Sequence, residues 1–248
     1  MKLALNIPKA WNELPPTTLK KIAWHFHKQK AGKELDLLIF FTLLNIRWWQ
    51  FSKYLKVFKI LKLVSMSELK NHFSFIYESN EITKFIPTLK IKGGELFAPG
   101  DRLHNITIKE FAVCEDLFFY YEQKNEIEYI RLLAAVLYRE KVNGKKIPFD
   151  KNELDETVKK LSKIDKKTLL AIYMIYKGST LEIQNAYKYI FKRVPPTANL
   201  KSRTPKAPQL EEVIQFMAGG KFGNLQQTEQ TNVHSFLKEY NNMLKPKK

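Results

Sequence analysis

The sequence predicts a mainly α-helical fold: a helical domain with one small β-hairpin, and a proline-rich linker to a short helical C-terminal extension. Three observations favour this fold. Apolar residues recur at helical spacing along most of the chain. Four capping signals mark helix starts, whereas a single paired-glycine segment indicates a hairpin. The hydrophobic fraction of 44% is enough to build a core, so the chain as a whole is expected to fold.

The first predicted helices lie near the N-terminus. Pro15 and Pro16 precede two threonines, and this order is typical of a helix start that leads into Leu19. A second helix is expected over 33–45, where the residues are apolar nearly all round and therefore buried. Segment 47–63 interleaves lysines with aromatic and aliphatic residues, and a helix is preferred there because a strand would give no clean alternation.

Capping signals place the later helices. Ser65, Thr107, Asn125 and Ser179 each stand three residues before a glutamate, an arrangement in which side chains satisfy the free N–H groups of a first helical turn. Gly178 is expected to end the helix before it. The predicted helices are 67–78, 108–122, 126–139, 151–162, 166–177 and 180–193.

The hairpin and the linker divide the chain. Gly93 and Gly94 predict a tight turn inside a hairpin near 89–98, because glycine adopts the positive φ that such turns need. Residues 1–193 are predicted to form the helical domain. Segment 194–208 contains four prolines and few large apolar residues, which is typical of an exposed linker. The extension 209–248 is expected to hold two short helices, at about 209–218 and 229–244.

Cysteine content and apolar runs limit the possible classes of protein. A single cysteine, Cys114, excludes an internal disulfide framework and fits a reducing compartment. The most apolar stretch, 35–44, is about half the length that a membrane span requires, so no span is predicted. The N-terminus lacks the continuous apolar segment of a signal peptide.

Positive charge is concentrated toward the two ends of the chain. The net charge is +17; residues 1–70 hold 13 Lys or Arg against 4 Asp or Glu, whereas residues 71–150 hold 11 against 12. Such a field favours anionic partners, including nucleic acid, acidic protein surfaces and anionic lipid. The alternative is a lysine-rich surface that is merely well solvated.

Candidate chemical groups do not assemble into a recognisable site. His25 and His27 point to opposite sides of a helix and cannot share a metal, and neither a metal nor another cofactor is predicted. Cys114 lies in an apolar helical pattern, where a buried, unreactive thiol is expected. Glu115 and Asp116 are adjacent and face different sides, so they are expected on a solvated face or a dock for basic partners. The chain is predicted not to be an enzyme.

The basic–aromatic segment 47–63 and the linker supply the candidate contact residues. Lysines could neutralise phosphates while aromatic rings stack on bases; the pattern also suits a helix on anionic lipid or a protein-docking helix with aromatic anchors. A core helix whose lysines solvate one side is the remaining alternative. The candidate partner or anion contacts are Trp48, Trp49, Lys53, Tyr54, Lys56, Lys59, Lys62, Lys201, Arg203 and Lys206.

Three stretches together carry a family resemblance: Ile7–Leu14, Gly100–Phe111 with Leu133–Arg139, and Lys221–Thr228. This layout resembles uncharacterised structural and tail-assembly proteins of phages and prophages of Bacteroidetes-type bacteria. The resemblance implies a non-enzymatic virion-structural or tail-assembly protein that acts by protein–protein contacts.

Such a protein would contact other phage structural or assembly proteins as a homo-oligomer or ring, in the host cytoplasm during assembly or in the virion. The alternative from another class is a nucleic-acid-binding protein that uses the basic N- and C-terminal regions. The two differ in salt dependence, because phosphate neutralisation makes affinity fall steeply with salt.

Overall fold

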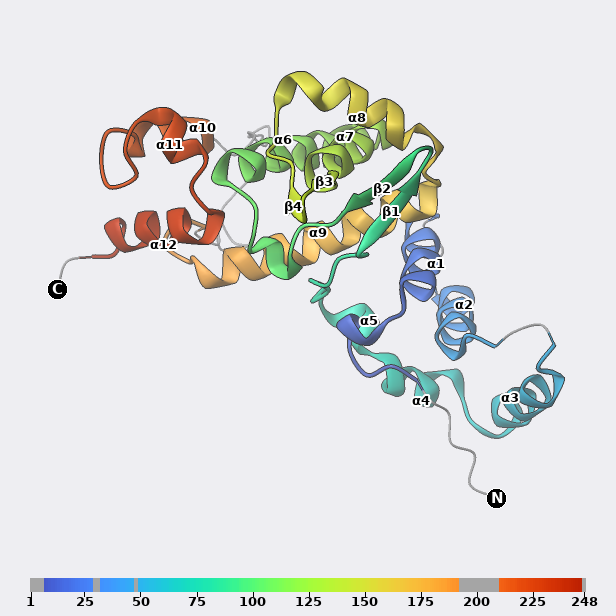
Figure 1. Cartoon of the computed structure of the whole chain (residues 1–248). Coiled ribbons are helices and arrows are strands. Elements are labelled where there is room, and N and C mark those ends of the chain that lie inside the picture. Colours follow the sequence, from blue (N-terminus) through green and yellow to red (C-terminus); the bar gives the residue numbers. More distant parts are fainter. Residues whose placement is uncertain (1–6, 29–31, 47–48, 192–209, 247–248) are drawn as a thin grey trace.

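The computed structural model describes residues 7–28, 32–46, 49–191 and 210–246. It confirms the mainly α-helical class: within these residues the chain forms twelve α-helices and two two-stranded antiparallel sheets (Figure 1). The helices are α1 (Pro16–His27), α2 (Gly32–Leu44), α3 (Phe51–Leu63), α4 (Met66–Lys70), α5 (Phe75–Glu78), α6 (Ile108–Lys124), α7 (Ile127–Leu137), α8 (Leu154–Lys160), α9 (Lys166–Ala186), α10 (Leu210–Met217), α11 (Leu225–Glu229) and α12 (Val233–Met243). The strands are β1 (Thr88–Ile91), β2 (Gly94–Phe97), β3 (Lys141–Val142) and β4 (Lys145–Lys146).

Helix α9 is the centre of the molecule. It packs against α1 on one side and α7 on the other, and α7 packs in turn along α6 (Figure 1). Its apolar side chains are buried along most of its length; Ile172 and Ile175 have no exposed surface. The predicted hairpin is present as β1 and β2, with Leu89 opposite Leu96 and both side chains buried.

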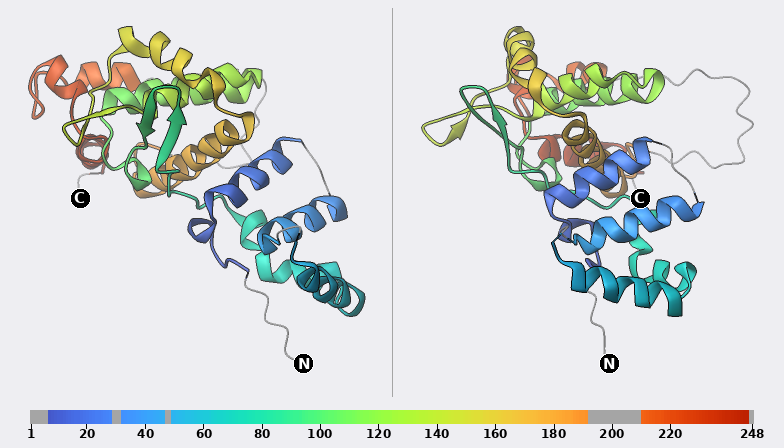
Figure 2. Two further views of the ribbon diagram at one scale, coloured as in Figure 1. Left: turned by 45° about the vertical axis from the view of Figure 1, so that its right-hand side comes forward. Right: turned by 90° about the vertical axis from the view of Figure 1, so that its right-hand side faces the viewer.

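The N-terminal helices form a lobe at one end of the molecule. Helix α2 packs against α1 and α4, and α3 lies at the outer edge of the lobe (Figures 1 and 2). Phe40 and Phe73 are fully buried, with ring centroids 6.1 Å apart. The indole Nε1 of Trp11 donates to the carbonyls of Phe75 and Ser79, at 3.0 and 2.6 Å, and so ties the start of the chain to α5.

Helices α10, α11 and α12 lie at the opposite end, where each contacts α6 (Figure 1). Two backbone hydrogen bonds join them to the domain: Ile108 N donates to Thr231 O (2.8 Å), and Val233 N donates to Ile106 O (3.0 Å). Apolar side chains of α12, including Phe236 and Leu237, are fully buried. The C-terminal helices therefore share a core with the preceding domain. The linker 194–208 lies outside the described residues.

Gly178 does not end a helix, and this prediction was wrong. One continuous helix, α9, runs from Lys166 to Ala186 and covers the predicted helix 166–177 together with the first part of the predicted helix 180–193. Residues 187–191 are not helical, and 192–193 lie outside the described residues. Gly178 lies where segment 80–82 crosses the helix, and a Cβ there would overlap the carbonyl oxygen of Ile82. The glycine therefore allows close packing. Ser179, which was predicted to start the second helix, therefore lies inside α9, and the neighbouring Thr180 hydroxyl donates to Lys177 O at 3.0 Å.

The other capping predictions had mixed outcomes. Thr107 and Glu110 form the predicted reciprocal capping box of α6, and Ser65 accepts from Glu68 N. Asn125 was placed at the wrong end: with φ of 54° it closes α6 instead of starting α7. Segment 67–78 is split into α4, a short 3-10 turn and α5.

The second hairpin, β3–β4, was not predicted from the sequence. Its two-residue turn is Asn143–Gly144, in which both residues have positive φ, at 52° and 76°. Asn-Gly is a strong signal for this type of turn, so the information was present in the sequence. The flanking strands are only two residues each and lack an apolar alternation, which hid the signal.

Candidate functional site

Helix α3 forms where helical spacing was preferred over a strand, and it buries very little. Its thirteen residues include four lysines and no carboxylate. Val57 is the one buried residue of the helix, at 1% exposure. Tyr54 is half-buried and its hydroxyl donates to Ile46 O at 3.4 Å, which holds the inner side of α3 against the segment that follows α2.

The outer side of α3 carries large apolar side chains that the described residues leave exposed. Phe51, Leu55 and Phe58 are 69, 65 and 55% exposed. Because they are spaced by four and three residues, they line one stripe of the helix. Leu63 and Trp49 extend the apolar area at the two ends of the helix, with 84 and 53% exposure.

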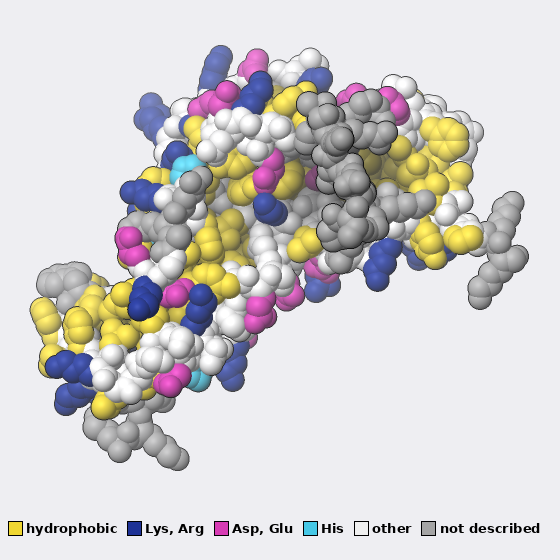
Figure 3. All heavy atoms as spheres, turned by 180° about the vertical axis from the view of Figure 1, so that it is seen from behind, with side chains coloured by type: hydrophobic (Ala, Val, Ile, Leu, Met, Phe, Trp, Pro, Cys, Tyr) yellow, Lys and Arg dark blue, Asp and Glu magenta, His cyan; other side chains and the backbone are white. Residues whose placement is uncertain are grey.

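Four lysines share the helix with this apolar stripe. Lys53, Lys56, Lys59 and Lys62 are all exposed, and none of them forms an ion pair with another described residue. Figure 3 shows hydrophobic and basic side chains gathered at this end of the molecule, at the lower left. We call this set the α3 surface: Trp49, Phe51, Leu55, Phe58, Leu63, Lys53, Lys56, Lys59 and Lys62.

The structure brings together six of the ten predicted contact residues. Trp49, Lys53, Tyr54, Lys56, Lys59 and Lys62 lie on or beside α3, with only Tyr54 turned partly inward. Trp48, Lys201, Arg203 and Lys206 lie outside the described residues. The sequence-based list omitted Phe51, Leu55, Phe58 and Leu63, because their outward direction depends on which side of α3 faces the lobe.

Buried ionisable groups form a second feature, in the centre of the domain. Glu110 of α6 is buried and pairs with the guanidinium of Arg139, while its other oxygen accepts from Thr107 N at 2.6 Å. Glu115 is buried as well and accepts a hydrogen bond from the Tyr176 hydroxyl at 2.7 Å. The expectation that Glu115 lies on a solvated face was wrong, because its side of α6 packs against α9.

Burial shifts the proton affinities of these groups. Removal of the Glu115 carboxyl from water raises its pKa to about 7, although the Tyr176 hydrogen bond opposes the rise. Cys114 is buried, as predicted, and burial raises the pKa of its thiol, which favours the protonated form. Lys146 donates to the Leu137 carbonyl, and its burial lowers the pKa of its ammonium to about 7. These groups are packed inside the domain, and we assign them a structural role.

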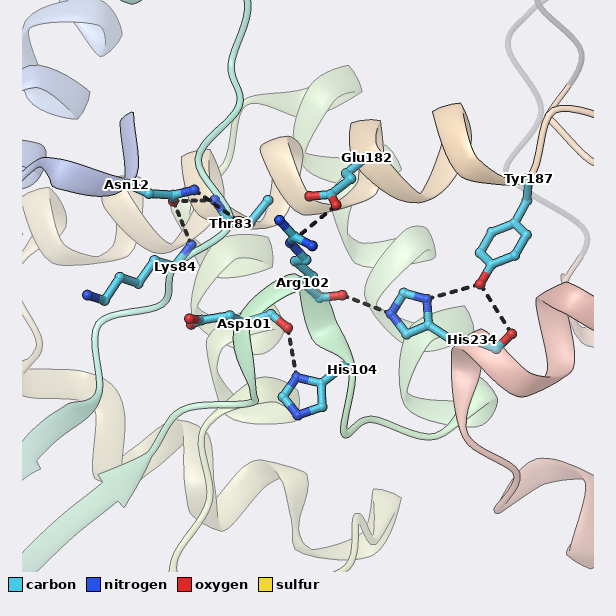
Figure 4. A network of polar contacts seen from close by, with 9 residues as sticks. All are labelled: Asn12, Thr83, Lys84, Asp101, Arg102, His104, Glu182, Tyr187 and His234. Carbon is cyan, nitrogen blue, oxygen red and sulfur yellow. Dashed lines mark hydrogen bonds and ion pairs between the residues drawn. The ribbon is translucent and has the colours of Figure 1, made fainter. Parts of the chain in front are cut away.

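A polar junction joins the loop 100–105 to α9 and α12 (Figure 4). His234 contacts the Arg102 carbonyl through Nε2 (3.0 Å) and the Tyr187 hydroxyl through Nδ1 (3.2 Å). The Arg102 side chain pairs with Glu182 of α9 at 3.2 Å. Arg102 and Leu103 both have positive φ, at 59° and 61°. The junction therefore holds a tight loop conformation and fixes α12 to the domain.

The cavities give little indication of a reaction site or a ligand-binding site. A cavity of about 320 Å³ lies beside the Arg102–Glu182 ion pair. Another, of about 220 Å³, is lined by Glu140, Glu156 and Lys160, and Lys160 pairs with both carboxylates at 3.0 Å. These five charged side chains are thus already paired with one another.

Two further searches cover the described part of the chain. Within it, no group of three or more His, Cys, Asp or Glu side chains is arranged to hold a metal ion. None of its helices is both long and apolar enough to cross a membrane.

Comparisons with known proteins found no match among protein-family models, curated proteins or solved structures. The resemblance to phage tail-assembly and structural proteins therefore stays a prediction. The α3 surface is the feature that carries a functional argument.

Proposed function

We propose that this protein is a non-enzymatic assembly protein that acts by protein–protein contacts, with the α3 surface as its docking site. The observation that carries the proposal is the exposed stripe of Phe51, Leu55 and Phe58 on a helix that buries only Val57. A contiguous apolar patch of this kind on a folded protein marks an interaction site more often than chance exposure.

The arrangement of the α3 surface favours a protein partner over nucleic acid. Protein interfaces have an apolar centre that excludes water and a polar rim. On α3 the apolar stripe is flanked by Lys59 and Lys56, and by Lys62 at the end of the stripe. Leu55 and Leu63 offer no ring on which a base could stack, whereas both suit a hydrophobic pocket.

The family resemblance supplies the finer proposal. It points to a virion-structural or tail-assembly protein of a phage or prophage, which would meet other phage structural or assembly proteins in the host cytoplasm or within the virion. Nucleic-acid binding is the second candidate function, and the net charge of +17 favours it.

Site-specific photocrosslinking in the producing cells tests the proposal. A benzophenone amino acid replaces Phe58 in the full chain, and a matched control replaces Val142, which is 58% exposed but lies on β3, away from α3. We expect Phe58 to yield discrete protein adducts that Val142 does not, and mass spectrometry to identify them as phage structural or assembly proteins or as another copy of this chain.

Other adducts would contradict the proposal. Adducts at position 58 that disappear on nuclease treatment would favour nucleic-acid binding. The same adducts at both positions, or none at either, would show that the α3 surface is not a specific docking site.

A further inference from the structure

We propose that the α3 surface of one copy docks on the α10 end of a second copy, so that the protein associates head to tail. The α10 end consists of Glu211, Glu212, Phe216, Leu225, Met243 and Leu244. This inference rests on the proposed function, because it names the partner of the same docking site.

The α10 end is the second place where large apolar side chains remain exposed. Phe216 is 71% exposed and Met243 56%, and Leu225 and Leu244 are more than 40% exposed. All four belong to α10 and to the starts or ends of α11 and α12, which lie together at one end of the molecule (Figures 1 and 2). The inner side of α10 is occupied, because Leu210, Ile214 and Met217 are buried. The exposed apolar residues of the α10 end therefore do not contribute to the core.

Helices α3 and α10 are complementary in charge. Helix α10 carries Glu211 and Glu212 and has no Lys or Arg, whereas α3 carries four lysines and no carboxylate. Glu212 lies one helical turn before Phe216, on the same side of the helix. On α3 the exposed apolar residues lie beside lysines, and on α10 they lie beside glutamates. Contact between the two helices would therefore join apolar surface to apolar surface and opposite charges to one another.

The position of the two surfaces determines the type of association. They lie at opposite ends of the molecule, with the central helix α9 between them (Figures 1 and 2). One chain therefore cannot cover its α3 surface with its own α10 end. A contact between two different surfaces is heterologous, and repetition of it produces a ring if the rotation closes or an open filament if it does not.

Mixing two variants of the full chain tests this geometry by sedimentation velocity. One variant, Leu55→Gln with Phe58→Gln, lacks the docking stripe; the other, Glu212→Gln with Phe216→Gln, lacks its counterpart. Glutamine keeps helix propensity and these positions are exposed, so circular dichroism should show unchanged helix content. We expect the wild type to form oligomers larger than dimers, and each variant alone to associate roughly tenfold more weakly or less.

The mixture gives the decisive result. Each variant keeps one intact surface, so an equimolar mixture should form a 1:1 dimer that cannot extend further. A contact of α3 with itself would leave the first variant monomeric in the mixture, and would leave the second variant as oligomeric as the wild type. Either that pattern or a wild type that stays monomeric up to the order of 100 µM would overturn the inference. In the latter case, a crosslink from position 58 to a different protein would leave the proposed function standing.

Discussion

At the residue scale, buried charged groups decide how the central helices fit together. Glu110 is satisfied twice, by the guanidinium of Arg139 and by the backbone N–H of Thr107 at the start of its own helix. Loss of the Arg139 guanidinium would leave a buried carboxylate without a compensating charge, which costs several kcal/mol in typical proteins. Glu115 has a different environment, because the group that donates a hydrogen bond to it, the Tyr176 hydroxyl, is neutral. Its protonation is therefore linked to folding.

Replacement of Glu115 by glutamine should flatten part of the pH dependence of stability. The pKa of folded Glu115 is about 7, above its usual value of 4.5, so the folded protein holds this proton more tightly than the unfolded chain. The stability that tighter proton binding by folded Glu115 contributes is fully present below about pH 4.5 and is lost as the pH rises to about 7. The loss is roughly 3 kcal/mol. Glutamine cannot lose a proton.

Urea denaturation at pH 5 and pH 8 provides the measurement. The free energy of unfolding of Glu115→Gln, relative to the wild type, should rise by roughly 2–3 kcal/mol between these pH values. An equal difference at both pH values would show that Glu115 is ionised in the folded protein throughout.

Gly178 should be intolerant of alanine although it lies inside a helix. Alanine normally stabilises a helix by about 1 kcal/mol relative to glycine. Here the added Cβ would overlap the Ile82 carbonyl and lie 3.0 Å from Asn80 O. We expect Gly178→Ala to lower the free energy of unfolding by about 2 kcal/mol. Gly94→Ala is the control, because its Cβ would meet nothing within 4 Å; equal effects of the two changes would contradict the packing role.

At the element scale, α3 has large apolar residues that face inward and others that face outward. The inward side contributes to the fold through Val57, whereas the outward side contributes little. Val57→Ala should lower the free energy of unfolding by about 2 kcal/mol, and Phe58→Gln should change it by no more than about 0.5 kcal/mol. Thermal or urea unfolding of the two variants checks this split. A large loss from Phe58→Gln would mean that the stripe belongs to the core.

The attachment of α12 depends on Asn232. Its side chain accepts hydrogen bonds from His234 N (3.0 Å) and Ser235 N (3.4 Å), and thereby caps the helix. Asn232→Ala should destabilise α12 by about 1 kcal/mol. Hydrogen exchange should quicken in α12 and leave α7 unchanged. Uniform acceleration in both helices would show that the C-terminal helices and the domain open as one unit.

Local patterns predicted the elements better than their contacts. Helical periodicity and the Thr107–Glu110 capping box gave α6 correctly, because both signals act within a few residues. Gly178 and Glu115 were misjudged because their roles come from distant segments: residues 80–82 for the glycine, and Tyr176 for the carboxylate. The α3 surface was predicted as a basic–aromatic segment. Its exposed stripe could not be assigned, since spacing alone does not say which side of a helix the rest of the chain covers.

At the scale of the whole molecule, a core built around α9 separates two unlike ends (Figure 1). One end presents the basic, apolar α3 surface, and the other presents apolar side chains beside the two glutamates of α10. Both apolar areas add nothing to the free energy of folding, because they stay in water in the single chain. Their burial on association would contribute roughly 25 cal/mol for each Å² of apolar surface removed from water.

Hydroxyl-radical footprinting tests the central claim that the α3 surface is open in the single chain and covered on assembly. The oxidation rates of Phe51 and Phe58 are measured in dilute purified protein and in native complexes isolated from the producing cells. Tyr120, which is 43% exposed on α6, serves as the internal reference. We predict fast oxidation of both phenylalanines in the dilute protein and at least a several-fold slower rate in the complexes, relative to Tyr120. Protection already present in the dilute protein, or equal rates in both states, would contradict the account.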